Sequence, residues 1–184
     1  DNKNKIIINT NLKSGIPMEN VNKIAGPFIE AWAHETFNND IEKKDNNNFF
    51  KKIEPGQRLN MADIILDFKS KNSSAIIKAN VDVKATSNDI KNSGKSPNIT
   101  SFSRIRSEYI KDPDYIFIIL SIKHRVYSKK NKKDSMMMGI MEIVDFKSYD
   151  LKYISKKDLS YNPALGTGQI QLRDIHNVSL EKRT

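Results

Sequence analysis

The chain has 184 residues, of which 38% are hydrophobic and 29% charged, and its formal net charge is +9. This length suits one domain with its own core, so we expect a single domain over residues 1–184. Cysteine is absent, which excludes a disulfide scaffold or a thiolate zinc site and favours a reducing, cytoplasmic compartment. No apolar run approaches the ~18 residues of a membrane span, and no signal-peptide pattern opens the chain. Because the chain begins at Asp1 rather than Met, we expect a trimmed part of a longer protein.

The basic balance permits a polyanionic partner such as nucleic acid. A second interpretation stays open, because Lys- and Asn-rich stretches such as "EKKDNNNFFKK" also arise from an A·T-biased genome. Such lysines then form a solvated surface with no partner.

The first half of the chain predicts a short strand, a helix and a hairpin. Ile6–Asn9 is a short extended segment, and from Pro17 onward apolar residues recur at helical spacing. The helical stripe consists of Val21, Ile24, Phe28, Ile29, Trp32, Ala33 and Phe37. Asn38–Lys52 is polar and predicts a loop, with one helical turn inside it as an alternative. Ala62–Phe68 and Ala75–Ala85 are rich in strand-forming residues and are joined by "KSKNSS", which predicts an antiparallel pair.

The second half predicts another helix and further strands. After a polar loop over Ser87–Asn98, the segment Ile99–Ile110 has the spacing of a helix. Tyr115–Lys123 is nearly all apolar, as in a central strand covered on both faces. Ser135–Phe146 and Gln169–Ile175 predict two more strands. This order predicts an α/β domain around a mixed sheet.

Acidic residues at the predicted hairpin form the main candidate site. Asp82 and Lys84 share one face of their strand, and the hairpin can bring Asp63 beside Asp82. Two close carboxylates repel unless a cation lies between them, and Mg²⁺ prefers such oxygen ligands. The Val83 carbonyl is a candidate third ligand, and Lys84 would orient water and counter charge on an attacked phosphate. Such a site suits phosphodiester hydrolysis.

Other interpretations of these residues stay open. Asp-x-Lys is short, and it also occurs as an ion pair on a surface strand. Glu30, on the first predicted helix, is a candidate further acid near the metal or an ordinary helix-surface glutamate. Glu35 is a weaker candidate for the same role. His34, His124 and His176 lack metal-ligand spacing, and we expect them to be structural.

The pattern "ADIIL…VDVK" resembles the PD-(D/E)XK nucleases, in which an acid on one strand pairs with an acid-x-Lys on the next. Ala62 stands where the motif's proline is usual. The segments "VDVKAT", "KSPNITS" and "NPALGTGQIQLRDIH" resemble blunt-cutting Type II restriction endonucleases of the HincII/EcoRV branch. Within it, "IIINTNLKSGIPMENVNKIAGPFIEAW" and "ITSFSRIRSEYI" are similar to the HpaI family.

The resemblance implies a restriction-endonuclease-like core, a mixed β-sheet flanked by helices. It also implies a homodimer that cuts palindromic double-stranded DNA with Mg²⁺ and leaves blunt ends with 5′-phosphate and 3′-hydroxyl groups. Asp63 and Asp82 would then be metal ligands and Lys84 the catalytic lysine, whereas Glu30 corresponds only by its helix.

Two polar segments are candidates for reading DNA. The resemblance implies base contacts from the Pro-Asn of the loop after Lys84, which indicates Asn98; an ordinary polar turn is the alternative. Asn and Gln suit adenine, and Arg suits guanine. The main candidate DNA contacts are Ser96, Asn98, Ser101, Arg104, Gln169, Gln171 and Arg173.

Two rival functions remain open at this point. One is a repair or structure-selective nuclease of the same fold. The other is a basic DNA-binding protein without enzymatic activity, and the paired acids argue against it because carboxylates near phosphates weaken binding.

Overall fold

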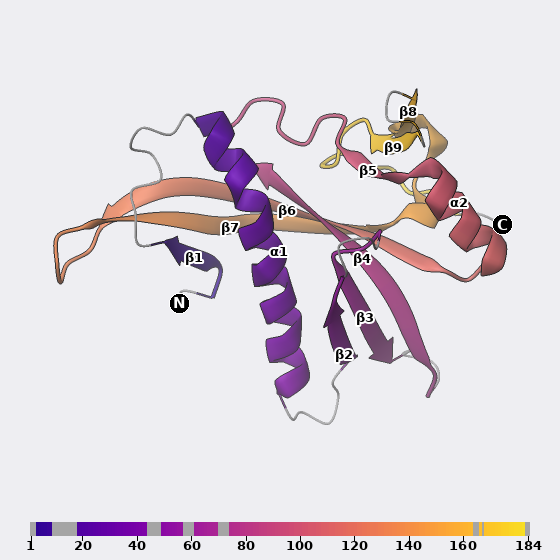
Figure 1. The fold of residues 1–184 in the computed structure, drawn as a ribbon, viewed down its shortest axis with the longest axis horizontal. Coiled ribbons are helices and arrows are strands. Elements are labelled where there is room, and N and C mark those ends of the chain that lie inside the picture. The colour runs from indigo at the N-terminus through magenta and orange to yellow at the C-terminus, as the bar shows by residue number, and fades with distance from the viewer. Residues whose placement is uncertain are drawn as a thin grey trace.

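The computed structural model describes residues 3–8, 18–43, 49–56, 61–69, 74–163, 166 and 168–182. A six-stranded mixed sheet has the order β1-β7-β6-β4-β3-β2, and a three-stranded sheet has the order β5-β9-β8 (Figure 1). The strands of the first sheet are β1 (Lys5–Ile8), β2 (Phe50–Pro55), β3 (Ile64–Lys69), β4 (Ile76–Ser87), β6 (Ile116–Lys130) and β7 (Met137–Asp150). Those of the second are β5 (Asn98–Ser101), β8 (Leu159–Asn162) and β9 (Gln169–Leu172). The helices are α1 (Met18–Glu42) and α2 (Phe102–Lys111), with 3-10 turns at Leu151–Tyr153 and Lys156–Asp158. The predicted α/β class with a mixed sheet is confirmed.

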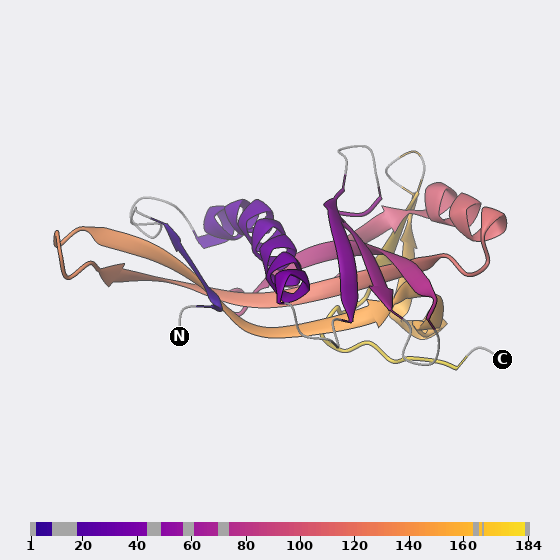
Figure 2. The same cartoon turned by 90° about the horizontal axis from the view of Figure 1, so that it is seen from below.

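Helix α1 lies across one face of the large sheet and contacts β2 and β4 (Figure 2). Its buried stripe recurs every four residues and consists of Val21, Ala25, Ile29 and Ala33. Ile24 and Phe28, which the apolar pattern placed on that stripe, are 41% and 40% exposed instead. The small alanines at the contact let the helix approach the sheet closely. The predicted start at Pro17 lies outside the described residues.

The predicted hairpin is confirmed. Strands β3 and β4 pair antiparallel with Ile64 opposite Val81 and Lys69 opposite Ile76. Residues 70–73 of the predicted turn lie outside the described residues. This register fixes which side chains stand together at the start of β3.

The apolar run that begins at Tyr115 is the central strand β6, as predicted. It pairs parallel with β4 and antiparallel with β7, so both of its edges are used. Both β6 and β7 are longer than the apolar runs indicated, and together they form the long hairpin seen in Figure 2. Within the extension, Val126 pairs with the buried Met141, and Arg125 forms an ion pair with Glu142.

Two local predictions are wrong. Within Asn38–Lys52 the end of α1 supplies the helical turn that was an alternative there, but the expected loop is wrong from Phe50, where β2 begins and pairs with β3. The helix expected from Ile99 begins at Phe102, because Asn98–Ser101 forms β5 against β9. Ile99 and Thr100 are buried in that strand, where their branched side chains pack well.

Two clusters of buried apolar side chains stabilise the fold. The first joins α1 to the large sheet through residues such as Ile29, Val83 and Ile122. The second joins β6 and α2 to the small sheet through Phe117, Ile105 and Leu172. Among the described helices, none is long and apolar enough to cross a membrane.

Candidate active site

The acidic pair forms where β3 begins. The Asp63 backbone N–H donates to the Val81 carbonyl at 3.0 Å, which continues the β3–β4 ladder by one residue. The Val83 N–H then donates to Asp63 Oδ2 at 2.7 Å. The Asp63 carboxylate therefore accepts a β4 N–H that a further residue of the neighbouring strand would otherwise bind. This contact fixes the Asp63 side chain beside Asp82.

Asp82 is buried, with 5% of its surface exposed. Lys84 Nζ donates to Asp82 Oδ1 at 2.7 Å, whereas Oδ2 has no hydrogen-bond partner among the described residues. Burial, with smaller contributions from the negative charges of Asp63 and Glu30, raises the pKa of Asp82 to about 7, although Lys84 lowers it in part. Asp82 thus belongs to a set of mutually repelling carboxylates with one ammonium group alongside.

Glu30 reaches this set from α1. It follows the fully buried Ile29, so the packing of the helix on the sheet sets its position. Partial burial raises the pKa of Glu30, the Asp63 carboxylate raises it further, and Lys84 lowers it. The structure therefore brings together Glu30, Asp63, Asp82 and Lys84, whereas Glu35 is exposed and the buried His124 lies in the core.

The donor set fits a hard divalent cation. A buried carboxylate oxygen of Asp82 has no partner, and the Asp63 carboxylate lies next to it. The N–H and C=O of one strand residue lie on the same edge, so the Val83 carbonyl is directed to the edge that Asp63 closes. No group of three or more His, Asp or Glu side chains in the described part of the chain could hold a metal. An ion here would therefore need backbone and water oxygens, which suits Mg²⁺.

Gly56, directly after β2, supports Asp63, a contact that no sequence motif indicated. Its N–H donates to the Asp63 carbonyl at 2.7 Å. A Cβ at this position would lie 1.9 Å from the Ala62 carbonyl oxygen, so only glycine fits. The sequence could indicate this contact only through a glycine at the end of a strand. That strand, β2, was not predicted, so the glycine could not be connected with Asp63.

The two predicted DNA-reading segments form one ladder. Asn98 on β5 pairs with Gln171 on β9, and Gln171 Nε2 donates to Asn98 Oδ1 at 2.8 Å and to the Ser96 carbonyl at 3.2 Å. Asn98 is exposed, and Gln171 is half-buried. The side chains of both candidates are therefore positioned by each other.

The remaining DNA-contact candidates have different surroundings. Gln169 pairs with Ser101 on the same ladder, and Arg173 is exposed just after β9. Ser101 is buried and caps α2 by accepting from the Arg104 N–H at 3.5 Å. Ser96 is exposed with a positive φ of 48°.

A polar hollow of about 450 Å³ lies between β4 and α2. Its lining includes Asn80, Ser103, Arg104 and Ser107. Asn80 precedes Asp82 by two residues on β4, so the two side chains share a face and the hollow lies on the side of the acidic pair. The predictions included Arg104 but missed Asn80, which no spacing distinguished from other strand residues.

Comparison with known proteins gives the same assignment. The family model described as Type II restriction endonuclease HpaI matches residues 1–184. The Type II restriction enzyme HpaI of Haemophilus parainfluenzae is 63% identical over 180 residues, which are 98% of this chain and 70% of that enzyme. The likeness to the HpaI family that the N-terminal and "ITSFSRIRSEYI" segments indicated is confirmed. The chain belongs to the HpaI family of Type II restriction endonucleases, site-specific deoxyribonucleases that bind double-stranded DNA and generally use a divalent metal ion.

Proposed function

We propose that the divalent ion is Mg²⁺ and that Asp63, Asp82 and the Val83 carbonyl hold it. The unpartnered oxygen of the buried Asp82 supports this most directly, because a buried carboxylate oxygen without a donor is costly unless a cation binds it. All three ligands are hard oxygens, which Mg²⁺ prefers.

In the proposed reaction, water adds to phosphorus while the P–O3′ bond breaks. One water proton ends on the 3′ oxygen, which leaves a 3′-hydroxyl and a 5′-phosphate. When bound, Mg²⁺ would lower the pKa of a water molecule and stabilise negative charge on the phosphate. Lys84, held 2.7 Å from Asp82 Oδ1, orients the attacking water and counters the developing charge. Glu30 acts as a further acid beside this set.

Recognition is assigned to the ladder of β5 and β9 and to the segments next to it. Asn98 and Gln171 present amide groups that can pair with base edges, adenine in particular. Arg104 and Arg173 supply charge for phosphates or guanine. The remaining proposed contacts are Ser96, Ser101 and Gln169.

The proposed unit is a homodimer of single-domain subunits. One acidic set per chain serves one strand, so two symmetric copies match the two strands of a palindromic site. Blunt ends follow if the two sets face the same base-pair step.

The test is digestion of a long linear DNA with Mg²⁺ or with EDTA, followed by sequencing of the ends. We expect discrete fragments only with Mg²⁺, and flush ends centred on one palindrome. Cutting of equal rate in EDTA would refute the metal assignment, and overhanging ends would refute the blunt geometry alone.

A further inference from the structure

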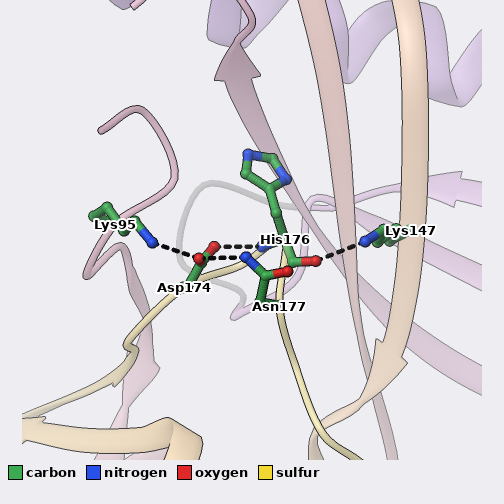
Figure 3. A network of polar contacts seen from close by, with 5 residues as sticks. All are labelled: Lys95, Lys147, Asp174, His176 and Asn177. Carbon is green, nitrogen blue, oxygen red and sulfur yellow. Dashed lines mark hydrogen bonds and ion pairs between the residues drawn. The ribbon is translucent and has the colours of Figure 1, made fainter. Parts of the chain in front are cut away.

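A polar network connects three chain segments beside the proposed recognition ladder (Figure 3). Lys95 Nζ, in the loop after β4, forms an ion pair with Asp174 Oδ2 at 2.5 Å. Asp174 also accepts from the His176 N–H at 2.9 Å and from Asn177 Nδ2 at 2.7 Å. Lys147 on β7 donates to the His176 carbonyl at 2.6 Å. The Asp174 carboxylate is therefore the centre of the network.

Backbone hydrogen bonds also join the loop before β5 to the turn after β9. The Ser96 N–H donates to the Arg173 carbonyl at 3.2 Å, and the Ile175 N–H donates to the Gly94 carbonyl at 3.0 Å. Gly94 has φ of 89°, and a Cβ there would lie 2.8 Å from His176 Nε2. The loop before β5 and the turn after β9 are therefore packed together tightly, with Asp174 bridging them.

Asp174 carries a negative charge beside the proposed DNA-reading surface, where a positive charge would be expected. A carboxylate near a DNA-reading surface repels phosphate, yet the Asp174 side chain is only 15% exposed and is fully engaged. Burial acts to raise its pKa, but the hydrogen bonds from Lys95, Asn177 and the His176 N–H outweigh it and hold the pKa well below its usual range. Asp174 thus stays ionised, and its charge is used within the protein.

We infer that Asp174 is a positioning residue for sequence recognition, which sets Asn98 and Gln171 at one fixed register by tying the loop before β5 to the turn after β9. This rests on the proposed base-reading role of those two amides. Loss of the contacts of Asp174 would let β5 and β9 shift relative to each other. Altered DNA sites would then be bound almost as well as the correct site. The acidic set on β3 and β4 would keep its own contacts, so the rate at the correct site would change less than the discrimination.

The test measures cleavage of short duplexes that carry either the site found by end sequencing or single base-pair changes of it. Asp174→Asn keeps the side-chain shape but removes the charge that binds Lys95. We expect the ratio of kcat/KM between correct and altered sites to fall about tenfold or more, which is the order of what one mismatched base pair contributes to specificity. The rate at the correct site should change only a few-fold.

Glu142→Gln is the matched control. Glu142 pairs with Arg125 on the β6–β7 hairpin, and its side chain is 13% exposed, close to the 15% of Asp174. This variant should discriminate as the unaltered protein does. A general effect of losing a partly buried ion pair would appear in both variants, and that result would overturn the inference.

A second variant covers the case in which Asp174→Asn does not fold. Lys95→Met removes the ammonium but leaves the Asp174 bonds to His176 and Asn177, and it should lower discrimination in the same way. Unchanged discrimination in the folded variant refutes the inference. If Asn98→Ala and Gln171→Ala also discriminate normally, the proposed base-reading role fails instead, so the two failures are distinguishable.

Discussion

At the residue scale, Asp63, directly before β3, and Asp67, within β3, allow the effect of the proposed site on cleavage to be separated from the effect of net charge. Asp63 accepts the Val83 N–H beside Asp82, whereas Asp67 lies opposite Lys78, four residues along the same strand. Asp63→Asn removes one proposed metal ligand, and we expect the cleavage rate to fall by roughly 10³-fold. DNA binding should persist, because the charge removed is negative.

The control for this change is Asp67→Asn, which removes the same charge from the same strand. It should cut at nearly the normal rate in a plasmid assay. Equal loss of cleavage in both variants would mean that net charge, and not the proposed site, limits the reaction.

At the element scale, the connection between β2 and β3 is predicted to matter for cleavage. Gly56→Ala would place a Cβ 1.9 Å from the Ala62 carbonyl oxygen, so the backbone that carries Asp63 must move. We expect cleavage to fall by at least about tenfold, since small displacements of reacting groups are costly. The measurement is single-turnover cleavage, with circular dichroism to confirm folding.

Gly26→Ala in α1 is the matched glycine control. Among the described residues, a Cβ there meets only Glu30 Oε1, at an ordinary 4.0 Å. Helix propensity should raise stability by about 0.5–1 kcal/mol, with cleavage retained. If Gly56→Ala cuts as well as Gly26→Ala does, the Gly56 support of Asp63 is unimportant.

Elements with long apolar patterns could be predicted, and those defined by distant partners could not. The β3–β4 hairpin and β6 follow from local strand formers, and the place of Asp63 beside Asp82 followed from that hairpin. Strand β5 escaped prediction because Asn98 and Thr100 pair with β9, about seventy residues away. For the same reason, Asn98 and Gln171 were predicted as DNA contacts from two separate segments, although their side chains form a hydrogen bond with each other.

The inferred role of Asp174 was likewise not predictable from the sequence. Its partner Lys95 stands 79 positions earlier. Both residues lie in segments that carry the family resemblance, but no sequence pattern connects one with the other. The Asp174–Lys95 ion pair depends on the contact between the loop before β5 and the turn after β9, which the pairing of β5 with β9 brings together. Glu30 was recognised only as a possibility, because its approach to the acidic pair depends on how α1 crosses the sheet.

At the scale of the whole molecule, the proposed dimer makes a prediction about strands. Co-expressing the unaltered chain with Asp82→Asn, under different affinity tags, gives mixed dimers with one working site each. We expect these purified mixed dimers to convert supercoiled plasmid to nicked circles, because only one strand can be cut. Linear product formed at the normal rate, without nicked circles, would refute the pairing of one site with one strand.

The unmatched Asp82 oxygen also has a consequence for thermal stability. A carboxyl whose pKa is higher in the folded state than in the unfolded state destabilises the fold at neutral pH, where the unfolded chain ionises it freely. In chelator, Asp82→Asn should therefore melt at a higher temperature than the unaltered protein, and adding Mg²⁺ should narrow the gap by stabilising only the latter. The carboxylate of Asp82 would then be required for cleavage and would at the same time lower the melting temperature of the metal-free protein. An equal or lower melting temperature for the variant in chelator would show that Lys84 alone already compensates the buried charge.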